Sequence, residues 1–182
     1  EKVASEEALE RYRQNLEELV AERTRSLEQA NARLRLSEQC KSATLWLSQH
    51  SAEMDEDEVL RFGLEAGKSF SLSAFGAVGL IDEDGRLPLR VWSQDTPEEF
   101  GPGLAGDFCG QLVRQLQPLI CNCQGDDPCR YFEPPARRVL GVPICDQGDV
   151  CLILCLFDKE EDYTMADAEE VQQLGLDLWR IV

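Results

Sequence analysis

The chain is poor in histidine and has no apolar run long enough to cross a bilayer. It contains one histidine among 182 residues, which nearly excludes catalytic triads built on histidine and metal sites that need several imidazoles. The short apolar runs exclude a membrane-spanning helix in this sequence. A phosphate-binding glycine loop, the kinase nucleotide motifs and the GGDEF and HD motifs are also missing. We therefore expect this chain to have none of the enzymatic activities that depend on these motifs.

Positive charge is scarce as well. The sequence has 35 acidic and 18 basic residues, and its net charge is −17. Residues 1–39 hold nine acids and seven bases, so the excess of acids comes from the rest of the chain. Such a surface repels nucleic-acid phosphates and anionic lipid headgroups. We therefore expect no nucleic-acid partner and no direct membrane binding.

Residues 1–39 contain neither glycine nor proline and are rich in strong helix formers. A heptad frame fits them, although two of its core positions are arginine, which weakens the apolar seam. The alternative is an amphipathic helix that packs on its own domain. We favour a parallel homodimer through residues 5–38, because the frame persists over the whole segment. The core positions are Leu9, Arg13, Leu16, Val20, Arg23, Leu27, Ala30 and Leu34.

The clearest pattern in the rest of the chain lies in residues 138–182. Two apolar runs, 138–145 and 150–157, flank a short polar turn and predict a β-hairpin. The second run is apolar at every position, which is typical of a central strand covered on both faces. Thr164, followed at the third position by Asp167, predicts the N-cap of a closing helix.

Weaker signals predict the elements between these segments. Asp55 and Glu58 form the capping box of a helix. Residues 74–81 and 87–92 read as strands around a turn at 82–85, residues 104–117 as a helix, and residues 118–121 as a further strand. The expected fold class is α+β.

The C-terminal segment resembles the second half of a GAF domain, the small-molecule sensory module of signalling proteins. The resemblance extends over residues 40–182 and is strongest after Arg138. It implies an antiparallel sheet with the terminal helices on one face, and a ligand pocket on the other face under the middle helix and residues 93–135. It rests on Val142-Pro143, Gly148, Tyr163-Thr164 with Asp167, and the closing Leu178 to Ile181.

Residues 16–31 are similar to the signalling helices of bacterial sensor kinases and diguanylate cyclases. The chain then divides into a signalling helix, residues 1–38, and a GAF-like sensory domain, residues 39–182. The resemblance implies a sensory and dimerisation module of a bacterial signal-transduction protein, such as a two-component system. It would bind an unknown small ligand and relay the signal through its terminal helices to an output domain, a histidine kinase or a diguanylate cyclase.

Three expectations follow for the chain as a whole. It starts without methionine and stops within a helical pattern, so we expect a fragment of a longer protein. We expect it to have no catalytic turnover of its own. We expect a cytoplasmic location, which is compatible with a parent protein anchored in the inner membrane.

The candidate ligand-binding residues lie in or next to the region that the resemblance assigns to the pocket. Fold-level analogy is their only support, because such pockets are built from scattered side chains without a short motif. The ligand is unknown, and we expect no tightly bound cofactor. The candidates are Trp92, Phe108, Cys109, Leu112, Cys121, Cys123, Cys129 and Tyr131.

Eight cysteines are many for a chain that we assign to a reducing compartment. Cys121, Cys123 and Cys129 lie close together in a polar segment, and Cys109 or Cys145 would be the fourth ligand of a metal site. A metal or thiol-redox sensor that uses the cysteines of residues 109–129 is thus the first alternative function. We favour ordinary cysteines, because the spacing is not that of a zinc knuckle. We expect no stably bound metal, with these three as the most reactive thiols.

Other residues have weaker functional interpretations. Phe108-Cys109-Gly110 looks like the helix start of the free methionine-R-sulfoxide reductases, which makes such an enzyme the second alternative, but residues 134–138 lack the expected cysteine. His50 is explained better by a surface helix end than by haem ligation or base catalysis. Cys151 and Cys155 should share one buried face of the central strand, and Cys145 should point to the opposite face.

Overall fold

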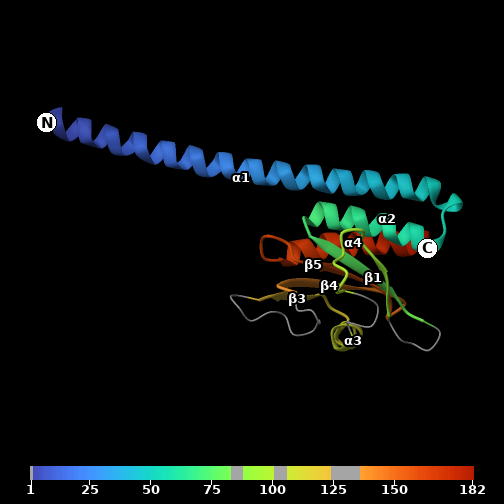
Figure 1. Cartoon of the computed structure of the whole chain (residues 1–182). Coiled ribbons are helices and arrows are strands. Elements are labelled where there is room, and N and C mark those ends of the chain that lie inside the picture. Colours follow the sequence, from blue (N-terminus) through green and yellow to red (C-terminus); the bar gives the residue numbers. More distant parts are fainter. Residues whose placement is uncertain (1, 83–87, 101–105, 124–135) are drawn as a thin grey trace. The chain divides into compact units, whose positions relative to one another are not determined.

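The computed structural model describes residues 2–82, 88–100, 106–123 and 136–182 (Figure 1). The chain divides into two compact units, Glu1–Glu38 and Gln39–Val182. The elements follow the order α1 (Lys2–His50), η1 (Ser51–Glu53), α2 (Glu56–Ser71), β1 (Phe75–Leu80), β2 (Leu89–Trp92), α3 (Gly106–Gln115), β3 (Leu119–Asn122), β4 (Arg138–Asp146), β5 (Asp149–Phe157) and α4 (Met165–Ile181).

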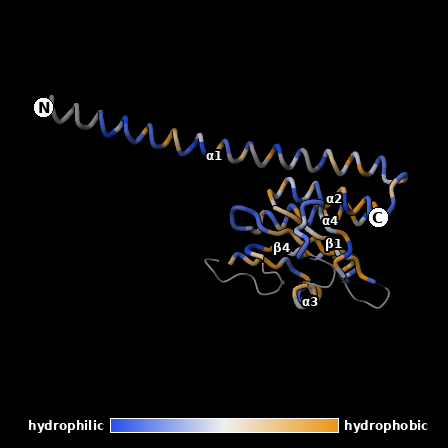
Figure 2. Tube along the Cα trace, viewed as in Figure 1, coloured by the Kyte–Doolittle hydropathy of each residue, from blue (hydrophilic) through white to orange (hydrophobic). Residues whose placement is uncertain are grey.

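The first unit consists of the N-terminal part of α1, a helix of 49 residues. Residues 10–28 are all exposed, and Figure 2 shows a mostly hydrophilic helix with isolated hydrophobic positions. Four of the proposed core positions of the heptad frame, Leu16, Val20, Leu27 and Leu34, are 43%, 62%, 63% and 58% exposed. The long helix is as predicted, and the pairing of two copies stays a prediction. No helix in the described ranges combines the length and the apolar character needed to cross a membrane.

The C-terminal end of α1 belongs to the second unit and packs within it. Leu47 is buried, and the Trp46 ring stacks on Phe62 of α2 with their centroids 4.9 Å apart. His50 ends the helix, is exposed, and stacks on Trp46. Its ring nitrogen Nδ1 lies 2.8 Å from the Trp46 carbonyl oxygen. The prediction that His50 lies at a surface helix end is therefore confirmed.

The second unit contains a five-stranded antiparallel sheet in the order β2-β1-β5-β4-β3. β5 is the central strand, and every residue after Asp149 in it is buried, as its apolar sequence predicts. β4 and β5 form the predicted hairpin, in which Asp146 pairs with Asp149. Gln147 and Gly148 form its two-residue turn with φ values of 53° and 100°, the left-handed conformation that such turns require.

The helices cover the two faces of the sheet unequally (Figure 1): α2 and α4 lie on one face and α3 on the other. α2 and α4 both begin with the capping boxes predicted from Asp55 and Thr164. α4 approaches the sheet closely because Gly175 lacks a side chain, and a Cβ there would lie 2.5 Å from Ile144 Cγ1. This arrangement confirms the α+β prediction of an antiparallel sheet with the terminal helices on one face.

A β-bulge near the turn changes which residues of the hairpin share a face. Ile144 pairs with Leu152 and Cys145 pairs with Val150, so Cys151 is an extra residue in β5. Cys145 therefore packs on the same side of the sheet as Cys155. The prediction that these two cysteines point to opposite faces is wrong, because the simple alternation of a regular strand does not continue through the bulge. Cys151 is buried, as predicted, and its thiol donates a hydrogen bond to the Ile144 carbonyl oxygen at 3.1 Å.

Candidate functional site

The face of the sheet under α3 carries the candidate site. Side chains from all five strands and from α3 pack there in one cluster, which we call the α3-side cluster. Its buried members are Phe75, Ala77, Leu89, Phe108, Cys109, Leu112, Ala136, Val139, Val150, Ile153, Cys155 and Phe157, and partly buried Trp92, Phe100, Leu119, Cys121, Cys123 and Cys145 pack against them.

The position of α3 depends on one glycine in β4. A Cβ at Gly141 would lie 2.5 Å from Phe108 Cε1 and 2.8 Å from Leu112 Cδ1. Real side-chain carbons do not approach so closely, so α3 can rest on β4 only because Gly141 has none. Phe108 and Leu112 are almost completely buried as a result. The space between α3 and β4 is therefore filled, and a ligand would bind beside these residues.

Four aromatic rings lie next to one another in the α3-side cluster, and we call them the aromatic group. The Phe75 and Phe157 rings stack with centroids 4.7 Å apart and planes 7° apart. Phe100 lies 4.7 Å from Phe75, and Trp92 lies 6.2 Å from Phe157. The rings come from β1, β5, β2 and the segment after β2, so only the folded sheet brings them together. They offer flat apolar surface suited to ring stacking.

The indole N–H of Trp92 is a polar atom inside this aromatic group. It is buried, and among the described residues it has no hydrogen-bond partner. Leaving a buried donor unpaired costs about 1–3 kcal/mol, and such atoms need an explanation where they occur. A ligand with an acceptor atom at this position would supply the missing bond.

The cysteines of the α3-side cluster form two pairs. Cys109 and Cys155 are hydrogen-bonded, and this bond lowers the pKa of Cys109 against the opposing effect of burial. The same bond and burial raise the pKa of Cys155 well above its ordinary value. In the second pair, the Sγ atoms of Cys121 and Cys123 are 3.8 Å apart. Within the described ranges, no three histidine, cysteine, aspartate or glutamate residues are grouped as metal ligands.

The structure brings together six of the eight candidate residues predicted from the sequence. Trp92, Phe108, Cys109, Leu112, Cys121 and Cys123 all belong to the α3-side cluster. Cys129 and Tyr131 lie outside the described residues. The sequence analysis missed the three phenylalanines of the aromatic group. A signal was present, because Phe157 closes the fully apolar run and Phe75 opens the strand that pairs with it.

A second group of polar residues ties the end of β3 and the end of α2 to the start of α4. Asn122 Nδ2 donates to the Tyr163 carbonyl oxygen, and the Tyr163 backbone N–H donates to Asn122 Oδ1, both at 2.9 Å. The Tyr163 hydroxyl and the Ser73 hydroxyl are 2.7 Å apart. The Lys159 ammonium donates to Asp167 at 2.9 Å. We call this group the α4 anchor.

A surface depression of ≈ 580 Å³ lies next to the α4 anchor, lined by the end of α2, the residues between α2 and β1, and the segment between β5 and α4. Its two basic side chains already have acidic partners. Lys68 binds Glu65 and Asp95, and Lys159 binds Asp167. Burial lowers the pKa of Lys68, but these hydrogen bonds outweigh it and raise the pKa overall. The depression therefore offers a ligand no basic group that is not already neutralised.

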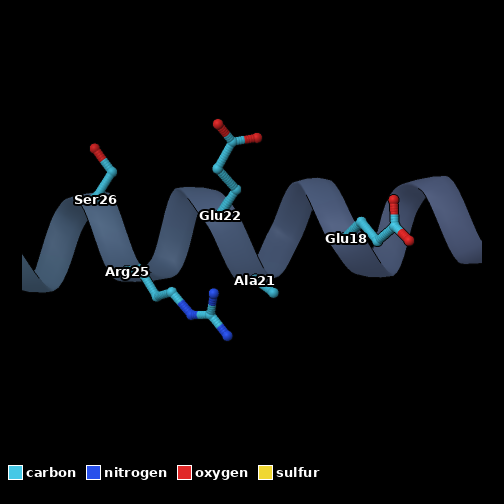
Figure 3. A pocket seen from close by; sticks show the side chains of 5 residues that line it. All are labelled: Glu18, Ala21, Glu22, Arg25 and Ser26. Carbon is cyan, nitrogen blue, oxygen red and sulfur yellow. The ribbon is translucent and has the colours of Figure 1, made fainter.

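Figure 3 shows a shallow depression of ≈ 470 Å³ on α1, lined by Glu18, Ala21, Glu22, Arg25 and Ser26. All five come from one helix, and they lie outside the core positions of the heptad frame. A depression with a single helix as its wall cannot enclose a ligand. It is therefore part of the outer surface of α1.

Comparisons with known proteins agree with this architecture. The GAF domain from an Acinetobacter phosphoenolpyruvate-protein phosphotransferase has a TM-score of 0.57 at 16% identity, over 85% of this chain and 92% of that one. The free methionine-R-sulfoxide reductase from Neisseria meningitidis, in complex with its substrate, has a TM-score of 0.60 at 15% identity, over 80% of this chain and 89% of that one. At these identities the similarity concerns the fold alone.

Sequence comparison adds a relative and a family. The methyl sulfide methyltransferase-associated sensor of Methanosarcina acetivorans is 23% identical over an alignment of 139 residues, which covers 69% of this chain. The chain spans only 14% of the length of that relative. Residues 53–182 match the family described as "GAF domain", a sensory module of signalling proteins. Fold, layer order and sequence agree, and the chain belongs to the GAF domain family.

Proposed function

We propose that residues 39–182 bind a small molecule beside the aromatic group, and that the chain relays this event through its terminal helices. Family membership supports a sensory role, and one relative is named as a sensor. The observation that carries the proposal is the buried indole N–H of Trp92, which has no partner among the described residues. An unpaired buried donor is useful in a binding site, because the ligand supplies the acceptor of the missing hydrogen bond.

The surroundings of Trp92 favour a flat, largely apolar ligand with one hydrogen-bond acceptor. Phe75, Phe100 and Phe157 provide rings for stacking, and the indole N–H fixes the orientation of the acceptor. The net charge of −17 opposes binding of a multiply charged anion. We expect a ligand that dissociates during purification, and no tightly bound cofactor or metal.

A thermal-shift screen of small aromatic carbonyl compounds tests this site. A compound that raises Tm should bind the Trp92→Phe variant roughly tenfold more weakly, because phenylalanine keeps the ring and removes the donor. Trp46→Phe is the matched control, since Trp46 lies on α1 outside the α3-side cluster. Equal loss of affinity in both variants, or none in either, would place the ligand elsewhere.

We also propose a parallel homodimer through residues 5–38. The exposed Leu16, Val20, Leu27 and Leu34 support it, because an isolated helix with this apolar stripe in water is only marginally stable. In a dimer the two copies would cover one another's stripe. The relay would then connect a ligand-binding domain to an output domain outside this chain, a histidine kinase or diguanylate cyclase of a bacterial signalling protein.

Sedimentation analysis decides whether α1 pairs. The chain should sediment as a dimer at micromolar concentration, and the double variant Val20→Asp/Leu27→Asp as a monomer, because two buried carboxylates cannot be accommodated in the seam. Glu18→Gln, at an outer position, should stay dimeric. A dimer that survives the double variant would show that the copies associate through another surface.

We further propose that this chain senses without catalysing a reaction. Cys109, the only described cysteine that resembles a reductase residue, is 5% exposed, and its partner Cys155 is fully buried. A nucleophile needs access to its substrate, and both thiols are buried in the cluster between α3 and the sheet. Incubation with free methionine sulfoxide and a thiol reductant should therefore give no methionine above the uncatalysed rate.

A further inference from the structure

We propose that Cys121 and Cys123 form a reversible disulfide, and that Asn122 between them transmits this change to the start of α4. The proposal rests on the proposed function in one respect, that α4 is a helix through which the domain relays its state. The oxidant that forms this disulfide is a low-molecular-weight disulfide. The three consecutive residues connect the α3-side cluster to the α4 anchor.

Cys121 lies in β3 and Cys123 directly follows its last residue, where the Cys123 N–H still bonds to the Arg137 carbonyl oxygen. Residues two apart in a strand point to the same face, and both side chains pack against the α3-side cluster. Their Sγ atoms are 3.8 Å apart, whereas a disulfide bond is about 2.05 Å long. Both residues are only partly buried, in contrast to Cys109, Cys151 and Cys155. Of the described cysteines, this pair therefore combines proximity with partial exposure.

Closing the bond has a consequence for the backbone. In an extended strand, the Cα atoms of residues two apart are separated by about 6.6 Å. This value is near the upper end of the Cα separations found in disulfides, which are usually about 5.5–6 Å. The Cβ atoms of a disulfide lie only about 3.5–4.5 Å apart, much closer than the Cβ atoms of residues two apart in a strand, so the chain must shorten and bend where the disulfide forms. The bend falls on Asn122, the last residue of β3, which pairs with Arg138 in β4.

Asn122 is also the residue of β3 that holds the start of α4. Its side chain makes two hydrogen bonds of 2.9 Å to the backbone N–H and C=O of Tyr163. Tyr163 directly precedes Thr164, the N-cap, whose side chain accepts a hydrogen bond from the Asp167 N–H. A change in the backbone at Asn122 moves its amide and weakens both bonds to Tyr163. Oxidation on one side of β3 would then loosen the helix start on the other side.

The chemistry balances as thiol–disulfide exchange. One thiolate attacks a sulfur of the small disulfide, forms a mixed disulfide and releases one thiol. The second thiolate attacks the protein sulfur of that mixed disulfide, forms the Cys121–Cys123 bond and releases the other thiol. The protein loses two protons and two electrons, and the oxidant becomes two thiols. An excess of dithiol reverses both steps.

Peptide mapping tests whether the disulfide forms, and amide hydrogen exchange tests whether its formation loosens the start of α4. The whole chain is incubated with oxidised glutathione, digested and mapped by mass spectrometry. We expect a disulfide between Cys121 and Cys123, reversed by dithiothreitol, and roughly tenfold faster amide exchange at residues 163–168 in the oxidised protein. Cys145→Ser is the control, because Cys145 is partly buried in the same cluster and should change neither result. Cys121→Ser and Cys123→Ser should each abolish the exchange response.

The variant Asn122→Ala tests whether Asn122 transmits disulfide formation to the start of α4. Its reduced form should already exchange faster at residues 163–168, and oxidation should add little, while the disulfide still forms. Recovery of Cys121 and Cys123 as thiols, as separate glutathione adducts, or bonded to other cysteines overturns the proposed site. A Cys121–Cys123 disulfide with unchanged exchange at residues 163–168 overturns the transmission through Asn122. Neither result depends on ligand binding at Trp92 or on dimerisation, so failure of the proposed function would be recognised separately.

Discussion

The two faces of the sheet are built from different kinds of side chain. Towards α2 and α4, aliphatic residues such as Leu154 pack against helices that approach closely at glycines. Towards α3, the face carries aromatic rings, two pairs of thiols and an indole N–H without a described partner. Neighbouring residues of β5 contribute to both faces of the sheet, since Leu154 belongs to the first face and Cys155 to the second. One face is suited to tight packing, and the other retains groups that can react or bind.

Substitution of these two neighbours should separate the two faces most clearly. Leu154→Ala should lower the free energy of unfolding by about 2–5 kcal/mol, because it leaves a cavity between tightly packed elements. Cys155→Ala should lower it by only about 1 kcal/mol, since it removes a single atom of roughly methylene size. Chemical denaturation measures both values. Equal losses would contradict this ranking, because removal of one heavy atom would then cost as much as removal of three.

Substitution of the glycines under the helices should have the next largest effect. Gly175→Ala should cost about 1–3 kcal/mol, because its Cβ collides with Ile144 between α4 and the sheet. Gly141→Ala places its Cβ against Phe108 and Leu112 of α3. We expect a smaller cost there, since α3 covers its face alone and can shift outwards. Thermal unfolding of the two variants would contradict this ranking if Gly141→Ala had the lower Tm.

Low pH should destabilise the face of the sheet that carries α4, mainly because it breaks the ion pair between Lys159 and Asp167. Although burial raises it, the pKa of Asp167 is lowered overall by hydrogen bonds from Lys159 and Thr164. A carboxylate with a lowered folded-state pKa stabilises the protein above its unfolded pKa, about 3.9, and this contribution is lost as the pH falls through the folded-state pKa. Asp167→Asn should therefore cost about 1 kcal/mol at neutral pH, and the difference from wild type should shrink below about pH 4. A difference that is independent of pH would exclude this origin.

The elements near the C-terminus could be predicted because their signals are local. The fully apolar run of β5 predicts a covered central strand, and Thr164 with Asp167 predicts the start of α4. The capping box of Asp55 and Glu58 likewise predicts where α2 begins. In each case, residues within one or two turns of one another make the interaction that the pattern indicates. The predicted turn at residues 82–85 lies largely outside the described residues.

The arrangement of the candidate site depends on pairings between distant residues. Phe75 meets Phe157, and Asn122 meets Tyr163, only because the strand order brings β1 beside β5 and β3 beside the start of α4. No single stretch of sequence carries these contacts. The unpaired indole N–H of Trp92 could not be predicted from the sequence either, since a buried tryptophan N–H normally has a hydrogen-bond partner.

The extra residue Cys151 also has a consequence for comparing this chain with its relatives. Through the bulge, Val150 lies on the same side of the sheet as Cys155, which it would not do in a regular strand. In a relative without the extra residue, the residue two positions before the equivalent of Leu152 would face α2 and α4 instead. Its alignment with this chain therefore needs a gap at Cys151. Columns aligned without that gap would equate Val150 of the α3-side cluster with a residue of the opposite face, and would obscure any shared specificity.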